Sequence, residues 1–295
     1  MYPATIDQYH RPKTVDEARS AYAAAGGEAM YIAGGMSLMQ AMKSRVLSCR
    51  ALIDLSQVSE LRGVENSAGR LRIGAMTRYR AVGEARAALG PFQALADAAD
   101  RVGDRQVRNR GTVGGSLSWN FVVACTPVAA LACGATVSIL RVDGRRESVS
   151  IDDFLQGPMT TALSEGDLLL GIEMAVPAGP ASSAYGKWGV VTDALPTIGV
   201  AVFVELASAS ACRNARIAVV GLPGGPARAA KAEARLKSAN LDDAAAFAAC
   251  AKEAAAECET AADPWVGADY KSHLIERLCL EMIGTAVRRA RSQLS

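Results

Sequence analysis

Two short glycine-rich stretches carry the residues of this chain whose types and spacing best suit the binding of an anion. The first runs from Ala33 to Ser37, and the second runs from Gly111 to Ser116 with three glycines within five residues. Glycine tolerates positive φ and leaves neighbouring N–H groups exposed, so each stretch could present several amides to one phosphate. A single diglycine is most often an ordinary tight turn. Two such stretches in one chain instead predict a diphosphate held between them.

The elements around the first stretch favour the same chemistry. Met30 to Ala33 reads as a short apolar strand, Gly34 and Gly35 as a turn, and a helix opens near Ser37. The first amides of a helix have no partner within it, and the helix dipole attracts negative charge. Ser37 is also a natural N-cap, so its hydroxyl could serve the helix alone. Behind the second stretch, the small apolar residues 127–135 predict a short, closely packed helix.

Common nucleotide-binding fingerprints and several other site classes are excluded by the residues present. A P-loop requires Lys after its last glycine, where Met36 and Ser116 stand, and neither stretch has the spacing of a Rossmann fingerprint. The formal charge of +2 does not indicate a nucleic-acid partner. With only His10 and His273, the chain has almost nothing from which to build a histidine metal site or a Ser-His-Asp triad.

Seven scattered cysteines include no Cys-x-x-Cys pair, which predicts reduced, mostly buried thiols and no zinc or iron–sulfur framework within this chain. We expect a cytoplasmic location, because Met1 to Thr14 lacks the pattern of an export signal. No apolar run approaches the roughly 20 residues of a membrane span. The Arg-rich run from Arg101 to Arg110 reads as a solvated turn, or as an anion clamp in which Arg108 or Arg110 takes part.

The pattern of elements predicts two domains, residues 1–177 and 178–295, with the first divided near residue 56. A helix capped by Thr14 opens a small α/β unit up to residue 56. Short strands around 61–64, 71–77, 135–142, 147–151 and 167–177 follow, with helices over 77–89 and 91–102. After a Pro/Gly/Ser-rich boundary, three strands within 184–222 precede helices over 227–237, 242–256 and 269–283. This order predicts an α+β domain at the C-terminal end.

Five motifs, in order along the chain, resemble those of the FAD-binding medium subunits of molybdenum-containing hydroxylases, the group of carbon monoxide dehydrogenase and xanthine dehydrogenase. They are His10-Arg-Pro-Lys-Thr, Ala33-Gly-Gly-Met-Ser-Leu, Ile73-Gly-Ala-Met-Thr, Val107-Arg-Asn-Arg-Gly-Thr-Val-Gly-Gly-Ser and Asp269-Tyr-Lys. The resemblance covers nearly the whole chain. It implies an α+β fold, with a two-part FAD-binding domain of the vanillyl-alcohol-oxidase-like type before a small antiparallel sheet with helices.

The resemblance also implies a set of residues around non-covalently bound FAD. The two glycine stretches would enclose the diphosphate, the strand end at 73–77 would lie along the cofactor, and further residues would reach its ribityl or ring region. The implied residues are Ile32, Ala33, Gly34, Gly35, Met36, Ser37, Leu38, Ile73, Gly74, Ala75, Thr77, Gly111, Thr112, Gly114, Gly115, Ser116, Asn120, Cys125, Leu169 and Lys187.

Two departures from the family pattern concern the flavin environment more than its binding. Cys125 stands where many relatives carry an Asp that contacts the cofactor, and a neutral thiol cannot replace a charge-assisted hydrogen bond. We interpret Cys125 as a small buried hydrophobe in preference to a reactive thiol. The segment from Val190 to Pro196 lacks the tyrosine that relatives place near the flavin.

The leading hypothesis is an electron-transferring flavoprotein subunit of a cytoplasmic complex. The resemblance implies a large molybdopterin subunit and a small subunit with [2Fe-2S] clusters, assembled as a dimer of heterotrimers, with no catalytic acid, base, nucleophile or metal in this chain. A stand-alone flavin oxidoreductase and a flavin-free assembly subunit are the alternatives. The substrate of the complex and the identity of the electron acceptor lie outside what this sequence specifies.

Overall fold

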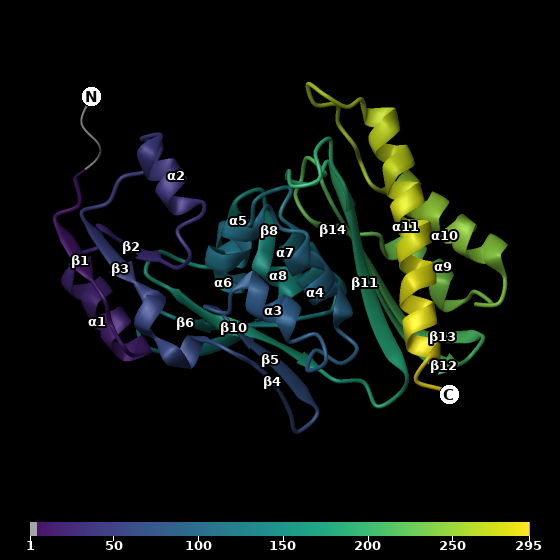
Figure 1. Cartoon of the computed structure of the whole chain (residues 1–295), viewed down its shortest axis with the longest axis horizontal. Helices are drawn as coiled ribbons and strands as arrows, with labels where there is room; N and C mark the ends of the chain where they lie inside the picture. Colours follow the sequence, from purple (N-terminus) through teal and green to yellow (C-terminus); the bar gives the residue numbers. More distant parts are fainter. Residues whose placement is uncertain (1–4, 295) are drawn as a thin grey trace.

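The computed structural model describes residues 5–294, so the first four residues of the predicted N-terminal domain lie outside the described range. Figure 1 shows an N-terminal unit, a central unit and a C-terminal unit arranged side by side along the long axis. Each unit is built on its own sheet, of three, five and four strands respectively. The expected mixture of helices and sheets is confirmed.

The N-terminal unit is a small parallel sheet with strand order β1-β3-β2. Its elements are β1 (Gln8–His10), α1 (Val15–Ala24), β2 (Ala29–Ile32), α2 (Leu38–Lys43) and β3 (Ala51–Asp54). The predicted Thr14 cap is confirmed, since its hydroxyl accepts a hydrogen bond from the Glu17 amide at 3.1 Å. The Glu17 carboxylate accepts a hydrogen bond from the Lys13 amide at 2.6 Å, one residue before the cap.

The central unit is an antiparallel sheet with strand order β4-β5-β10-β6-β7, so β10 lies between two hairpins. Its strands are β4 (Val64–Ser67), β5 (Arg70–Gly74), β6 (Thr136–Leu140), β7 (Arg146–Ser150) and β10 (Leu168–Ala175). The predicted strand over 61–64 is displaced, because Leu61 ends a short 3-10 turn (Ser59–Leu61) and is buried against the N-terminal unit. β4 pairs with β5 and β6 pairs with β7, so each pair forms an antiparallel hairpin.

Helices cover one face of the central sheet and form the largest core with it. They are α3 (Tyr79–Glu84), α4 (Gln93–Asp100), α5 (Arg105–Arg110), α6 (Val113–Trp119), α7 (Cys125–Ala132) and α8 (Ile151–Phe154), followed by the small ribbon β8 (Leu155–Gly157) and β9 (Thr160–Thr161). The predicted turn over 101–110 is wrong in part, because Asp104 caps α5 by accepting from the Val107 amide at 2.8 Å. The second glycine stretch also enters a helix, α6.

The C-terminal unit is an antiparallel sheet with strand order β11-β12-β13-β14. Its elements are β11 (Ala181–Trp188), β12 (Ile198–Ser208), β13 (Ala211–Val220), β14 (Ala227–Arg228), α9 (Ala230–Lys237), α10 (Ala244–Glu257) and α11 (Ala268–Arg291). The three predicted strands and three predicted helices are present. Residues 227–228, expected in the first helix, instead pair with β13.

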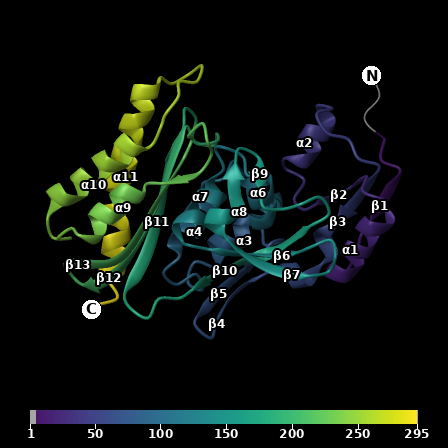
Figure 2. The ribbon, with the colours of Figure 1, turned by 180° about the vertical axis from the view of Figure 1, so that it is seen from behind.

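Both faces of this C-terminal sheet are buried. Figures 1 and 2 show α9, α10 and α11 on one side and the helices of the central unit on the other. Tyr185 and Phe203 pack into the same core as Phe92, whereas Ala184 and Val202 pack into a core shared with Leu274 and other residues of the covering helices. Side chains that alternate along a strand therefore belong to two different cores.

Candidate functional site: two contacting glycine loops

The first glycine loop leaves β2 with a run of backbone amides that no described residue accepts from. Gly35 has φ +72°, in the left-handed region that glycine adopts without strain. Within the described part of the chain, the N–H groups of residues 34–37 have no hydrogen-bond acceptor. The exposed Ser37 occupies the N-cap position of α2, but its side chain caps nothing. The first loop thus has the unpartnered backbone amides that the sequence predicted, and the Ser37 side chain makes no capping bond to α2.

The two glycine loops, about eighty residues apart in sequence, lie against each other. A Cβ atom added to Gly34 would stand 2.1 Å from the Arg110 carbonyl oxygen and 3.0 Å from the Gly111 Cα. A Cβ atom added to Gly115 would stand 3.7 Å from the Ala33 Cβ. Only glycine permits this approach at position 34, because the contact is with backbone that cannot move aside.

The second loop differs from the expected arrangement in its backbone. Gly111, Gly114 and Gly115 all have negative φ, and the last two lie inside α6. Their amides are also used within the protein: Gly114 donates to the Ala75 carbonyl at 2.8 Å and Gly115 to the Thr112 hydroxyl at 3.1 Å. The expectation that these amides face an anion is therefore wrong. The second loop can still contribute to a binding site through the small size of its residues and through the hydroxyl of the half-buried Ser116.

Close packing explains the glycines of the second loop. A Cβ atom at Gly114 would stand 2.5 Å from that of Ala75, and one at Gly111 would stand 2.5 Å from the Tyr79 ring. The stretch that follows β5 therefore lies directly against α6. Ala75 also donates its amide to the Leu170 carbonyl at 3.0 Å, which ties this stretch to the central strand β10.

The predicted strand end at residues 73–77 is buried, as is the predicted Leu169 on β10. The Thr77 hydroxyl is hydrogen-bonded within the protein: it accepts from the Gly63 amide and donates to the Gly63 carbonyl, both at 3.0 Å. Around the first loop, Ile32, Met36 and Leu38 are half-buried. The Ile32 side chain lies beside Gly35.

Asn120 ends α6 in the left-handed conformation, with φ 40°. Its fully buried side chain donates to the Gly157 carbonyl at 2.7 Å and to the Thr160 carbonyl at 3.0 Å, whereas its Oδ1 has no partner within residues 5–294. An unpartnered buried polar atom costs free energy, so such atoms are usually satisfied by a ligand or an ordered water. Asn120 therefore has an unused acceptor at the end of α6, the helix that contains Gly114 and Gly115.

Cys125 begins α7 and is 4% exposed, which agrees with its interpretation as a small buried residue. Burial raises the pKa of its thiol, so the group is protonated near neutral pH. On the adjoining strand β11, burial and the neighbouring Cys125 thiol raise the pKa of Tyr185 well above its ordinary value. Sequence reasoning missed Tyr185, although its alternation with Lys187 on one strand placed the two side chains on the same face.

Lys187 is half-buried and donates from Nζ to the Ala194 carbonyl at 2.6 Å. Burial lowers the pKa of its ammonium group, and the neighbouring Arg101 and Arg108 lower it further. The bond reaches into the connection between β11 and β12, where Val191 is 62% exposed. Of the two predicted anion clamps, Arg108 is bonded to the Val102 and Gly103 carbonyls at 3.2 and 2.6 Å, and Arg110 is exposed.

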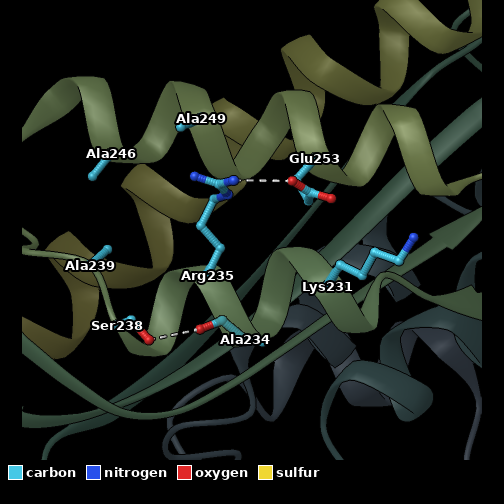
Figure 3. A pocket seen from close by; sticks show the side chains of 8 residues that line it. All are labelled: Lys231, Ala234, Arg235, Ser238, Ala239, Ala246, Ala249 and Glu253. Atoms are coloured by element: carbon cyan, nitrogen blue, oxygen red, sulfur yellow. Dashed lines mark hydrogen bonds and ion pairs between the residues drawn. The ribbon is translucent and has the colours of Figure 1, made fainter.

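A groove of about 580 Å³ lies elsewhere, between α9 and α10 (Figure 3). Four of its eight lining residues are alanines, and Arg235 and Glu253 form an ion pair across it at 3.2 Å. It contains no group suited to redox chemistry. Across residues 5–294, no cluster of His, Cys, Asp and Glu could hold a metal ion, and no helix is long and apolar enough to cross a membrane.

Comparison with family models matches nearly the whole chain. Residues 4–178 match the FAD binding domain in molybdopterin dehydrogenase, and residues 183–286 match the CO dehydrogenase flavoprotein C-terminal domain. Among curated proteins, the carbon monoxide dehydrogenase medium chain of Hydrogenophaga pseudoflava is 32% identical over 283 residues, which cover 96% of this chain and 95% of that protein. The nicotine 6-hydroxylase medium subunit of Paenarthrobacter nicotinovorans is 30% identical over 258 residues, covering 88% and 89%.

Solved structures give the same result. The carbon monoxide dehydrogenase structure from Hydrogenophaga pseudoflava superposes with a TM-score of 0.90 at 32% identity, covering 98% of this chain and 99% of that chain. Quinoline 2-oxidoreductase from Pseudomonas putida 86 superposes with a TM-score of 0.89 at 27% identity, with the same coverage. The motifs, the fold and these comparisons agree, and the chain therefore belongs to the family of FAD-binding medium subunits of molybdenum-containing hydroxylases.

Proposed function

We propose that this chain binds FAD between its two glycine loops and passes electrons from iron–sulfur clusters on a partner chain to an external acceptor. The observation that carries the proposal is the contact between the loops, which sets the unpartnered amides of residues 34–37 beside α6. The family supplies the identity of the cofactor. When bound, FAD supplies the redox chemistry, and the protein supplies its binding and orientation.

The residues present fit a flavin dinucleotide. The amides of residues 34–37 and the start of α2 would receive the diphosphate, because backbone N–H groups at a helix start bind anions well. Ser116 would add its hydroxyl from the other side, and the unpartnered Oδ1 of Asn120 would accept from a hydroxyl of the cofactor. Cys125 at the start of α7 and Lys187 on β11 would lie toward the ring.

The further contacts in the proposal follow the sequence motifs. They comprise Ile32, Ala33, Met36, Leu38, Ile73, Gly74, Ala75, Thr77, Gly111, Thr112, Gly114, Gly115 and Leu169. Because the Thr77 hydroxyl and the Gly114 and Gly115 amides are used within the fold, these residues would contribute shape rather than hydrogen bonds. No residue of this chain is assigned acid, base or nucleophile chemistry.

The partner chains belong to the same proposal. Relatives of this chain are named as medium chains or subunits, which supports a complex with a large molybdopterin subunit and a small [2Fe-2S] subunit. We extend the proposal to a dimer of heterotrimers. We also propose a cytoplasmic location, in line with seven cysteines that are all free thiols. The division into domains 1–177 and 178–295 is part of this proposal.

The decisive experiment measures FAD uptake by the chain and by a matched pair of variants at Ser37. Saturation at 100 times Kd would stabilise the folded chain by about 2.7 kcal/mol. Ser37→Asp keeps a good N-cap but places a carboxylate at the proposed diphosphate site, so we expect at least about a tenfold weaker Kd from like-charge repulsion. Ser37→Asn introduces a side chain of nearly the same size and shape as that of Ser37→Asp but without the charge. We expect this variant to bind FAD like the unmodified chain. Equal affinities for the two variants would contradict the placement.

The partner proposal is tested by purification of the native complex with a tag on this chain. Co-purification of chains that contain molybdenum and iron, with a flavin spectrum, is the expected outcome. A yellow protein that purifies alone and turns over a small substrate would instead indicate a stand-alone oxidoreductase. A colourless protein that takes up no added FAD would indicate a flavin-free subunit.

A further inference from the structure

A group of arginines without carboxylate partners lies beside the two glycine loops. Residues 101–110 contain four arginines and one aspartate, although the whole chain has a formal charge of only +2. Within residues 5–294, none of these four arginines lies within ion-pair distance of a carboxylate, and neither does Arg78. The nearby Arg80, in contrast, forms an ion pair with Glu84 at 2.6 Å. We refer to the five unpaired residues as the basic surface: Arg78, Arg101, Arg105, Arg108 and Arg110.

Three of these arginines are grouped by α5 and by the chain that leads into it. Arg105 and Arg108 stand three residues apart in α5, so they share one helix face. Arg108 donates to the Gly103 carbonyl at 2.6 Å, which holds its guanidinium over the segment that follows Arg101. The group also reaches the C-terminal sheet. Burial lowers the pKa of the Lys187 ammonium, and the positive charges of Arg101 and Arg108 lower it further.

The other two arginines of the basic surface border the proposed FAD site. The Arg110 carbonyl lies against Gly34 of the first glycine loop. Arg78 forms an isolated backbone bridge with Thr112, two residues after Arg110. The basic surface therefore adjoins both loops between which the cofactor is proposed to bind.

The positions of these side chains suit a partner outside the chain better than the FAD diphosphate. All members of the basic surface except Arg108 are exposed, and the Arg108 guanidinium is bonded to two backbone carbonyls. The aspartate of the run, Asp104, accepts from the Val107 amide as the cap of α5, and it lies beyond ion-pair distance of the arginines. The positive charge is thus left uncompensated at the protein surface.

Uncompensated, exposed charge is typical of a surface that binds a partner briefly. The core of a stable subunit interface is depleted of charged residues. Weak electron-transfer encounters use small interfaces, and surface charges chiefly raise the association rate with an oppositely charged partner. A positive surface beside a redox site therefore favours an acidic carrier protein over a permanent subunit.

We propose that the basic surface docks an acidic protein that carries one electron at a time and is the external electron acceptor of this chain. This inference rests on the proposed function and names the class of acceptor. Two carrier molecules, which bind in turn, take the two electrons of the reduced flavin, and the protons that the flavin loses pass to water.

The first test uses the chain without FAD and isotope-labelled plastocyanin, a copper protein with an acidic surface, as the probe. We expect NMR amide signals of that acidic surface to shift at about 20 mM salt and to return at about 200 mM, because salt screens the attraction. Arg105→Glu should raise the Kd about fivefold. A carboxylate in the first turn of α5 also favours the helix, so the variant should fold. Absence of shifts with the unmodified chain would overturn the docking surface even if FAD binds normally.

Two matched variants separate the position of the charge from the total charge. Arg105→Lys keeps the charge and should bind plastocyanin like the unmodified chain. Arg146→Glu makes the same change in charge at an exposed residue of the edge strand β7, and it should alter the Kd less than about twofold. Equal effects of Arg105→Glu and Arg146→Glu would show that only the total charge matters, and the proposal would fail.

The second test follows the oxidation of the dithionite-reduced, FAD-loaded chain by stopped-flow absorbance. We expect oxidation by plastocyanin to slow at least about tenfold between about 20 and about 200 mM salt, whereas oxidation by cytochrome c, which is basic, should become faster. Arg105→Glu should slow the reaction with plastocyanin about fivefold and leave the Kd for FAD unchanged. If NAD⁺ oxidises the reduced chain faster than plastocyanin does, and Arg105→Glu slows only NAD⁺, the basic surface binds a nucleotide and the proposal is wrong.

The native complex distinguishes a brief partner from a permanent one. A tagged Arg105→Glu chain should co-purify with the same molybdenum- and iron-containing chains as the unmodified chain. Loss of those chains would place a permanent subunit on the basic surface and overturn the proposal. Failure of the unmodified chain to take up FAD would refute the proposed cofactor site instead, and the NMR titration would still show whether the surface docks an acidic protein.

Discussion

At the residue scale, Gly34 is the position where the contact between the two loops is most sensitive. Gly34→Ala would place a methyl group 2.1 Å from the Arg110 carbonyl oxygen, so the loops must separate. We expect a loss of FAD binding and a destabilisation of about 1–3 kcal/mol, as for other overpacked sites. Calorimetry and FAD titration measure both. Gly224→Ala is the matched control, because a Cβ atom there meets nothing within 4 Å. Normal FAD binding by Gly34→Ala would show that the contact is unnecessary.

Thiol reactivity is a second property set by individual residues. Burial raises the pKa of Cys133 and of Cys258 to about 12, and it raises that of Cys125 as well. Only Cys49 of the seven cysteines is not buried. We therefore expect one thiol to react with an aromatic disulfide reagent at pH 8 in the folded chain, and seven after unfolding. Peptide mapping identifies the labelled cysteine, and labelling of Cys125 as fast as Cys49 would contradict its burial.

The glycines show which features of the two loops residue types alone can predict. Their clustering predicted where the two loops lie and that they belong together, and Gly35 does have the expected positive φ. The reason assigned to Gly111, Gly114 and Gly115 was wrong, because they are needed for contact with Tyr79, Ala75 and Thr112 rather than for unusual backbone angles. A sequence shows that a side chain is absent. It does not show which neighbour fills the space.

At the element scale, one buried carboxylate joins α4 to β11 and α11. Asp97 accepts from Arg86 at 2.8 Å, from Arg289 at 2.7 Å and from the Tyr185 amide at 3.3 Å. Burial alone would raise the pKa of Asp97, but the bonds from Arg289 and Arg86 outweigh it and the pKa is lowered. The chain thus fastens the central helices to the C-terminal sheet through a charged group.

Removal of this carboxylate gives a prediction with a defined pH dependence. We expect Asp97→Ala to lower the unfolding free energy by about 3 kcal/mol, since Arg289 loses its carboxylate partner and Arg86 keeps only Asp100. Because the folded pKa is lowered, the stabilisation is complete above the unfolded-state pKa of about 4 and is lost as pH falls through the folded pKa. Denaturant titrations from neutral to acid pH should show the two proteins converging. Asp100→Ala, at a half-exposed partner of Arg86, should cost no more than about 1 kcal/mol.

The elements that the sequence predicted are those with strong periodicity, such as β5, β6, β7, β10 and α11. The helix α6 was missed, because two adjacent glycines oppose helix formation and only Thr112 and the contact with Ala75 compensate. The helix α5 was missed although Asp104 offered an N-cap signal, because its arginines read as solvated charge. Strands of two or three residues, such as β9 and β14, carry too little pattern to be recognised.

At the scale of the whole molecule, the central and C-terminal units share one core. The Phe92 and Phe203 rings stack at 5.9 Å between centroids across the boundary. A fragment of residues 1–177 would expose the faces of α4 and α7 that pack against the C-terminal sheet, so we expect it to aggregate or to bind a hydrophobic dye. The full chain, in contrast, should unfold in a single transition. Light scattering and calorimetry test both statements. A monomeric, folded fragment would show that the interface is dispensable.

The burial of the C-terminal sheet on both faces also limits how this part of the chain can diverge among relatives. In β12, every residue from Ile198 to Val204 is buried, so neither set of alternating side chains is free to become polar. Substitutions that persist in such a strand must exchange one apolar shape for another on two sides at once. We therefore expect sequence change in this part of the chain mainly at the strand ends and in exposed connections such as residues 190–196.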